Sequence, residues 1–250
     1  DLAEQLAENA GLKPSVASGD ADIALELVSP TRLAVQARRL DLDLPETPAG
    51  TYLIQVADAV HAWAADSDGL FYAAQTIAQL ATAQGTIPRC RVADRPAYPV
   101  RGLQYDVARG QTVEVEWWKR VIRNLARCKL NMLVVYGEDD YGFEGYPFLG
   151  REGTFTPAKA KLLSEYAHQY HMQLVPQFES LGHASAVLRH EELADLREAG
   201  GSWVFCTSEP KVWEFLDNIY AELAEQFPYS EYLHVGGDEF ERGFHKCERC

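Results

Sequence analysis

Asp238 and Glu239 are adjacent acids that follow two glycines and a short apolar segment, in the run His234-Val235-Gly236-Gly237-Asp238-Glu239. Like charges this close hinder each other's ionisation, so one acid can keep its proton near neutral pH while the other stays charged. Cleavage of a glycosidic bond needs such a pair, because the leaving oxygen takes a proton while a cation develops beside it. The same acids could instead cap a helix, since negative side chains are favoured at helix N-termini. The surrounding sequence has to decide between the two readings.

The elements that must position these acids alternate between strands and helices from about Arg101 onward. Apolar runs bounded by polar residues predict the strands, and apolar residues three and four apart predict the helices. This alternation is typical of a parallel sheet with right-handed crossovers. The predicted strands are 102–107, 131–136, 173–178 and 232–235, and the predicted helices are 114–129, 156–170 and 209–227.

Polar residues stand at or just after the end of each predicted strand. Groups gathered from the carboxyl ends of several strands are typical of a TIM barrel, and the first strand has no glycine-rich phosphate loop of the kind a nucleotide-binding sheet would show. We therefore predict the α/β class and a (β/α)8 TIM barrel. The residues concerned are Asp106, Arg109, Asp139, Asp140, Glu179, His183, Asp238 and Glu239.

The number of residues available for this barrel is too small for a closed one. A complete barrel takes roughly 250 residues, and 250 − 95 = 155 follow Arg95. We expect residues 96–250 to be the first four βα units, incomplete at the C-terminus, with the rest supplied by a longer polypeptide or by another chain.

Residues 1–95 predict a small α+β domain without convergent catalytic groups. Alternating residues indicate strands at 23–28, 32–37, 51–57 and 60–64, with Ser29-Pro30-Thr31 as a turn, and a helix follows at 70–83. Residues 92–99 are rich in proline and predict a connection, with the domain boundary near Arg95.

Charge and cysteine content limit the partners and the compartment. The net charge of −14 repels phosphate backbones, which argues against nucleic acid, and no apolar stretch is long enough to span a membrane. Five cysteines at irregular spacing do not indicate a disulfide framework and favour a reducing, cytoplasmic compartment, although a cleaved export signal would leave no trace. Cys247-x-x-Cys250 could be half a zinc site or a redox pair. With no second pair in the sequence, we expect reduced thiols, no metal and no cofactor.

Four segments resemble glycoside hydrolase family 20, the β-N-acetylhexosaminidases. The run His234–Glu239 resembles the family's His-x-Gly-Gly-Asp-Glu signature, and Arg101–Arg109 resembles its first barrel strand, Arg-Gly-x-x-x-Asp-x-x-Arg. Glu138-Asp139-Asp140 is similar to the Asp-Asp after the second strand. Leu181-Gly182-His183 is similar to the Pro-Gly-His after the third, with leucine in place of proline, and Glu179 replaces the usual aspartate. The resemblance implies that residues 1–95 are the family's non-catalytic N-terminal domain.

The resemblance also implies an exo-acting, retaining and substrate-assisted reaction on glycans that end in β-linked N-acetylglucosamine or N-acetylgalactosamine. Glu239 would protonate the glycosidic oxygen, and Asp238 would orient the substrate's acetamido group as its oxygen attacks carbon 1 to give an oxazolinium ion. Asp139 and His183 would support the acid. The residues implied in substrate binding are Arg109, Asp140 and Glu179.

Two other functions stay open at the level of sequence. The sequence also leaves open whether the protein forms a homo-oligomer. Asp139, His183, Asp238 and Glu239 are also ligand types for a metal-dependent barrel hydrolase. A non-catalytic sugar-binding module with a degenerate barrel is the third reading.

Overall fold

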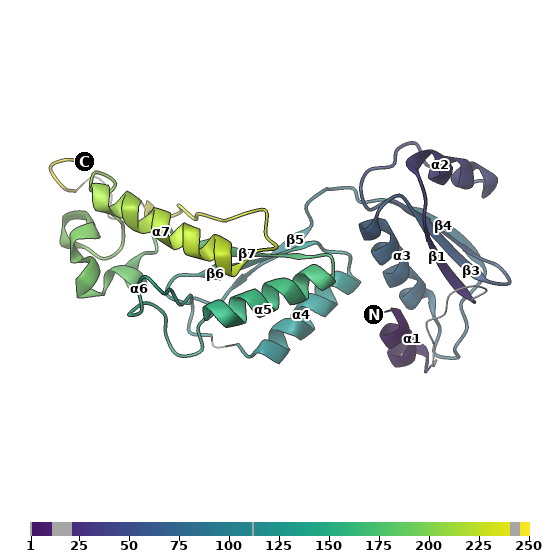
Figure 1. The fold of residues 1–250 in the computed structure, drawn as a ribbon, viewed down its shortest axis with the longest axis horizontal. Helices are drawn as coiled ribbons and strands as arrows, with labels where there is room; N and C mark the ends of the chain where they lie inside the picture. The colour runs from purple at the N-terminus through teal and green to yellow at the C-terminus, as the bar shows by residue number, and fades with distance from the viewer. Residues whose placement is uncertain (1, 12–21, 112, 241–245) are drawn as a thin grey trace. The chain divides into compact units, whose positions relative to one another are not determined.

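The structure is a computed structural model that describes residues 2–11, 22–111, 113–240 and 246–250 (Figure 1). Contacts divide the chain into two compact units. The first comprises Asp1–Val100 with Arg127–Lys129, and the second comprises Arg101–Ala126 with Leu130–Cys250. The predicted domain boundary near Arg95 lies close to this division.

The first unit contains a four-stranded sheet in the order β1-β3-β2-β4, in which β1 and β3 are parallel and β2 is antiparallel to both of its neighbours. Alternate residues of β2 and β3 enter two different apolar clusters, so both faces of the sheet are covered. One face packs against α3 and the other against α2. The elements of this unit are α1 (Leu2–Ala10), β1 (Ile23–Leu27), α2 (Pro30–Arg39), β2 (Tyr52–Val56), β3 (Val60–Ala64), α3 (Ser67–Leu80) and β4 (Cys90–Asp94).

Residues 32–37, predicted as a strand, belong to helix α2 (Figure 1). Ser29 and Pro30, read as a turn, instead start the helix. The Ser29 hydroxyl accepts a hydrogen bond from the Arg32 amide at 3.2 Å, and Pro30 occupies the first turn, where a missing N–H costs nothing. The prediction was wrong because a short segment with Leu33 and Ala37 four residues apart also fits a helical face, and both are buried against the sheet.

Residues 90–94 form strand β4, although residues 92–94 were predicted as part of a connection. They pair with the whole of β2, which needs a partner on that edge. Helix α1 was not predicted at all. Both errors concern elements whose partners lie far away in the sequence.

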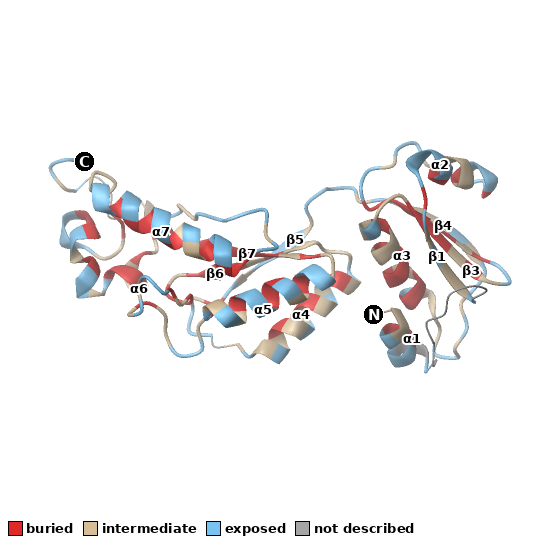
Figure 2. Ribbon diagram, viewed as in Figure 1, coloured by how far each residue is buried: buried red, intermediate tan, exposed pale blue. Residues whose placement is uncertain are grey.

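The second unit contains the parallel strands β5, β6 and β7, in that order, with a helix after each (Figure 1). Figure 2 shows α7 with buried residues along one side and exposed residues along the other, as its apolar spacing predicts. The elements are β5 (Gly102–Asp106), α4 (Val115–Arg127), β6 (Met132–Gly137), α5 (Pro157–Gln169), β7 (Gln173–Phe178), α6 (Ser185–Leu188), the 3-10 helices η1 (Glu191–Leu196) and η2 (Glu198–Gly200), and α7 (Pro210–Gln226).

The predicted fourth strand, 232–235, lies parallel to β7 but is held by a single bridge between His234 and Gln177. His234 donates its amide to Pro176 at 3.0 Å and accepts from the Phe178 amide at 3.1 Å. Four strand segments therefore follow one another in chain order without a reversal, which is the arrangement of a barrel wall and not of a doubly wound sheet.

The two outer segments of this sheet carry exposed apolar residues. Leu103 on β5 is 42% exposed, and Val235 in the fourth segment is 50% exposed. Barrel strands have neighbours on both sides, so these edges fit a partial barrel whose sheet continues beyond the strands described.

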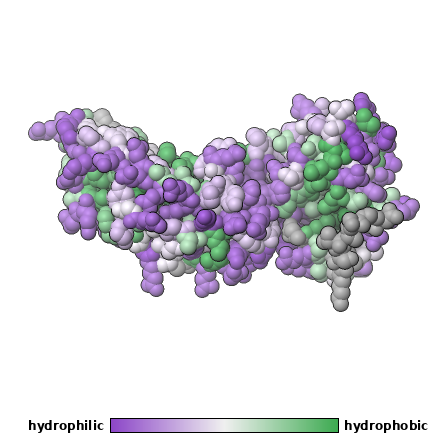
Figure 3. Space-filling view, viewed as in Figure 1, coloured by the Kyte–Doolittle hydropathy of each residue, from purple (hydrophilic) through white to green (hydrophobic). Residues whose placement is uncertain are grey.

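Hydrophilic residues cover much of the face of the molecule in Figure 3, in line with the net charge of −14. None of the helices in the described ranges combines the length and the apolar character needed to cross a bilayer.

Candidate functional site

Asp238 and Glu239 follow the fourth strand segment in a turn that needs unusual backbone angles. Gly236, Gly237 and Glu239 have φ values of 64°, 106° and 47°. A side chain at Gly236 would enter the space of the Glu179 carboxylate. The indole nitrogen of Trp203 donates to the Glu239 carbonyl oxygen at 2.8 Å, and a non-glycine residue in the left-handed region needs such support. The turn leaves both acid side chains 59% exposed at the sheet edge.

His183 lies between the acid pair and Glu138. Its Nε2 is 3.5 Å from Asp238 Oδ2 and 3.6 Å from Glu239 Oε2, and its Nδ1 is 3.4 Å from Glu138 Oε1. The ring packs on Trp203 with 4.6 Å between centroids, and the side chain is 11% exposed. The Glu138 carboxylate beside Nδ1 favours the ring orientation in which Nε2 faces Asp238 and Glu239.

Asp139, implied by resemblance as the partner of His183, points elsewhere. Its Oδ1 accepts from the Gly150 amide at 2.6 Å, and its Oδ2 pairs with Arg189 at 2.6 Å. Glu138 takes its place beside His183, which corrects the expectation. The chain bends at Glu138 and Asp139, directly after β6, and their carboxylates reach different partners. Glu138 is also held by Tyr136, whose hydroxyl donates to it at 3.0 Å.

Asp140 is 4% exposed and lies inside the loop after β6. Its carboxylate accepts from Arg151 Nε at 2.7 Å. Burial holds the pKa of this acid above its usual range, and the Arg151 bond opposes that effect. The substrate-binding role implied for Asp140 is therefore not matched by its position, since its described contacts hold a loop.

Glu179 is buried directly behind the acid pair. Gln177 donates to its Oε1 at 2.7 Å and the Gly237 amide donates to its Oε2 at 3.1 Å. Burial raises the pKa of Glu179, and the neighbouring charge of Asp238 raises it further. A protonated Glu179 can donate a hydrogen bond to Asp238 and adds no further negative charge beside the acid pair.

Arg109 reaches over from the end of β5 with its side chain 53% exposed. It pairs with Glu138 at 2.9 Å and with Asp106 at 3.8 Å, and its guanidinium carbon lies 5.3 Å from the centre of the Tyr136 ring. These contacts hold the planar fork in one orientation. The structure thus brings together Arg109, Glu138, Glu179, His183, Asp238 and Glu239, together with Trp203, for which the sequence offered no signal.

The ligand set of the metal-dependent alternative is not brought together, because Asp139 faces Arg189 and not the acid pair. Within the described ranges, the side chains close enough to share a metal ion are Glu198, Cys206, Cys247 and Cys250, which lie outside this site.

Comparisons with known proteins identify the family of both units. Residues 98–250 match the family model described as glycosyl hydrolase family 20, catalytic domain, and residues 1–95 match domain 2 of the same family. A β-N-acetylhexosaminidase of Cellulomonas fimi is 30% identical over 231 residues, which is 80% of this chain and 46% of that protein.

Solved structures give the same relation. The N-acetyl-β-hexosaminidase of Streptomyces plicatus, in complex with thio-NAglucal, is 26% identical with a TM-score of 0.79, covering 96% of this chain and 52% of that one. The family 20 β-N-acetylhexosaminidase of Streptomyces coelicolor A3(2) is 26% identical with a TM-score of 0.77, covering 95% and 52%. The chain spans about half the length of these relatives. Because the catalytic-domain model covers more than half of it, the chain belongs to glycosyl hydrolase family 20.

Proposed function

We propose that the polypeptide carrying this chain is an exo-acting β-N-acetylhexosaminidase that releases terminal β-linked N-acetylglucosamine or N-acetylgalactosamine. The observation that carries the proposal is the acid pair, with Asp238 and Glu239 both within 3.6 Å of the same nitrogen of His183. The names of the relatives support this substrate class. Retention through a substrate-assisted mechanism is part of the proposal.

In the first step Glu239 gives its proton to the glycosidic oxygen as the bond between that oxygen and carbon 1 breaks. The carbonyl oxygen of the substrate's 2-acetamido group forms a new bond to carbon 1 and closes a bicyclic oxazolinium ion. Asp238 accepts a hydrogen bond from the acetamido N–H, which orients the group and stabilises its growing positive charge. An attacking group already held within the substrate removes much of the entropic cost of the step.

In the second step the Glu239 carboxylate takes a proton from water, whose oxygen attacks carbon 1. The bond from carbon 1 to the amide oxygen breaks and the acetamido group is restored. Two displacements at carbon 1 return the β configuration.

The neighbouring residues set the charges that these steps need. His183 lies near both acids and beside Glu138, so its ring is held with Nε2 toward the acid pair. Burial and the charge of Asp238 raise the pKa of Glu179, which favours its protonated form and a hydrogen bond from Glu179 to Asp238. Arg109 offers planar N–H donors that suit vicinal sugar hydroxyls.

Glu239→Gln in the full-length protein tests the role of the acid. We expect hydrolysis of alkyl and oligosaccharide β-N-acetylglucosaminides to fall by on the order of 10²-fold or more. Aryl glycosides should lose less, because a good leaving group needs little protonation. Glu231→Gln, at an exposed acid eight residues earlier, is the matched control and should keep wild-type rates. Equal losses on both substrate classes would contradict the role of Glu239 as the acid.

Asp238→Asn tests the substrate-assisted step. The variant should lose activity on 2-acetamido substrates, and the wild-type protein should act poorly on 2-hydroxy glycosides with the same leaving group. A wild-type protein that hydrolyses both kinds equally well would rule out attack by the acetamido group. Sugar binding without turnover in the wild-type protein would support the non-catalytic module instead.

A further inference from the structure

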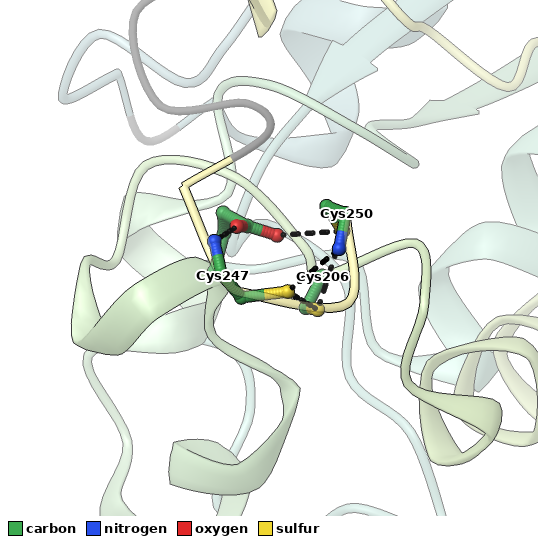
Figure 4. A group of neighbouring side chains, drawn as sticks. Cys206, Cys247 and Cys250 are labelled. Carbon is green, nitrogen blue, oxygen red and sulfur yellow. Dashed lines mark hydrogen bonds between the residues drawn. The ribbon is translucent and has the colours of Figure 1, made fainter.

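Three cysteines and a glutamate meet beyond the acid pair, although they come from three separate segments. Glu198 begins η2, Cys206 lies in the loop before α7, and Cys247 and Cys250 follow the acid-pair turn. Their ligand atoms all lie within 4.8 Å of one another, and Glu198 and Cys206 are buried. Figure 4 shows the side chains of Cys206, Cys247 and Cys250 next to one another. The sequence showed only the Cys-x-x-Cys half of this group.

The spacing of these atoms suits a shared metal ion. Cys206 Sγ is 3.5 Å from Cys247 Sγ and 3.9 Å from Cys250 Sγ. A tetrahedral zinc ion with Zn–S bonds of about 2.3 Å places its sulfurs about 3.8 Å apart, whereas a disulfide needs about 2.05 Å. Glu198 Oε2 is 3.3 Å from Cys250 Sγ, against roughly 3.6 Å for a sulfur and an oxygen on the same zinc.

The groups around the cluster are arranged as they are around bound thiolates. The Cys250 amide donates both to the Cys247 carbonyl at 3.1 Å and to the Cys247 sulfur at 3.3 Å, which closes the Cys-x-x-Cys turn. Ser208 Oγ lies 3.0 Å from Cys250 Sγ, where it can donate to a thiolate. Glu198 Oε1 accepts from the amides of Lys246, at 2.8 Å, and Cys247, so the other oxygen faces the sulfurs. Such outer contacts orient metal ligands and are a normal part of metal sites.

We propose that Cys206, Cys247, Cys250 and Glu198 bind one zinc ion in a closed, four-coordinate site. Three thiolates and one carboxylate fill the tetrahedron, which leaves no open position for water or substrate and marks the role as structural. The proposal replaces the expectation of free thiols without a metal.

The position of this site in the fold indicates which segments a bound metal ion would link. Cys206 donates its amide to Leu196 at 2.9 Å, and its neighbour Phe205 donates to Leu181, next to the loop that carries His183, at 3.1 Å. Cys247 lies eight residues after Glu239 in the chain. A zinc ion shared by these segments would therefore fasten the chain after the acid pair to the loops that support His183 and Trp203.

Metal content of the full-length protein tests the site directly. The wild type is purified under reducing conditions with added zinc and then dialysed. It should hold close to one zinc ion per chain, as measured by inductively coupled plasma mass spectrometry. Cys247→Ser and Cys250→Ser should lose most of it. Cys90→Ser and Cys128→Ser, at cysteines outside the cluster, are matched controls and should keep it. Wild-type protein without zinc, or variants that keep it, would overturn the proposal.

Cobalt substitution keeps the test decisive if the serine variants fail to fold. Wild-type protein loaded with Co²⁺ should show thiolate-to-metal charge-transfer absorption and the strong d–d bands of a tetrahedral site. Glu198→Gln should weaken Co²⁺ binding while the thiolate bands remain at saturating metal. Thiol labelling followed by mass spectrometry counts the cysteines that are oxidised in wild-type protein purified under reducing conditions. A disulfide that includes Cys206, Cys247 or Cys250 would reject the zinc site.

Discussion

Gly182→Ala isolates the close packing between the loop after β7 and the acid pair. A Cβ at position 182 would fall on the Asp238 carbonyl oxygen, closer than real Cβ contacts come, and would lie 3.1 Å and 3.2 Å from the Glu239 carbonyl carbon and oxygen. Because φ at Gly182 is not in the left-handed region, alanine adds no backbone strain of its own. The backbone that carries both acids has to move.

The size of the effect follows from what moves. The obstructing atoms are backbone atoms, which cannot swing aside as a side chain can, and an overpacked site costs about 1–3 kcal/mol of stability. A displacement of about 1 Å at a reacting group costs on the order of 10²-fold in rate. We therefore expect kcat on an aryl β-N-acetylglucosaminide to fall ~10- to 100-fold. The change in KM should be smaller, because Arg109, proposed to hold the sugar hydroxyls, lies at the end of β5 and is not displaced.

Steady-state kinetics and thermal unfolding of the full-length protein measure both quantities. Gly142→Ala is the matched control, because a Cβ there would meet its neighbours at 3.7–3.8 Å, an ordinary contact. If Gly182→Ala keeps kcat within twofold of Gly142→Ala while remaining folded, the close approach does not position the acids and the reasoning is refuted.

Three further predictions concern single side chains. Glu138→Gln removes the charge facing His183 and should lower kcat roughly tenfold or more. Asp139→Asn should mainly lower the free energy of unfolding, by about 2 kcal/mol. Steady-state kinetics and urea unfolding of both variants separate the two roles, and the reverse pattern would restore Asp139 as the partner of His183. Because burial raises the pKa of Glu179, the folded state holds its proton to higher pH than the unfolded state, so the free energy of unfolding should fall as pH rises above 4.5, the usual value. Urea unfolding across pH should show a shallower fall for Glu179→Gln than for Glu231→Gln, and equal slopes would count against a protonated Glu179. Thr156→Ala removes the hydroxyl that accepts from the Lys159 amide at 3.2 Å at the start of α5, and should cost about 1 kcal/mol in urea unfolding without changing KM; an unchanged midpoint would show that the cap contributes nothing.

The sequence by itself determined the features that depend on local pattern. Apolar runs, helical spacing and the Thr156-Pro157 helix start predicted β5, α4, β6, α5, β7 and α7, because these signals lie in neighbouring residues. The position of Asp238 and Glu239 just after an apolar segment predicted acids at a strand end, and both lie in the turn after the fourth strand segment.

Tertiary structure alone decided the features that depend on distant partners. Residues 32–37 form a helix because their apolar side has a sheet to cover, and residues 90–94 form a strand because β2 offers an open edge. Which acid faces His183 was decided by the direction in which β6 ends, which favours Glu138 over Asp139.

The cysteine cluster shows the same division most plainly. Spacing along the chain revealed Cys247 and Cys250, but Cys206 and Glu198 lie 41 and 49 residues from Cys247 in the sequence. These ligands come within reach of one ion only when the loops before α7 pack against residues 246–250. A contact between residues distant in the sequence produces no periodic pattern from which it could be predicted.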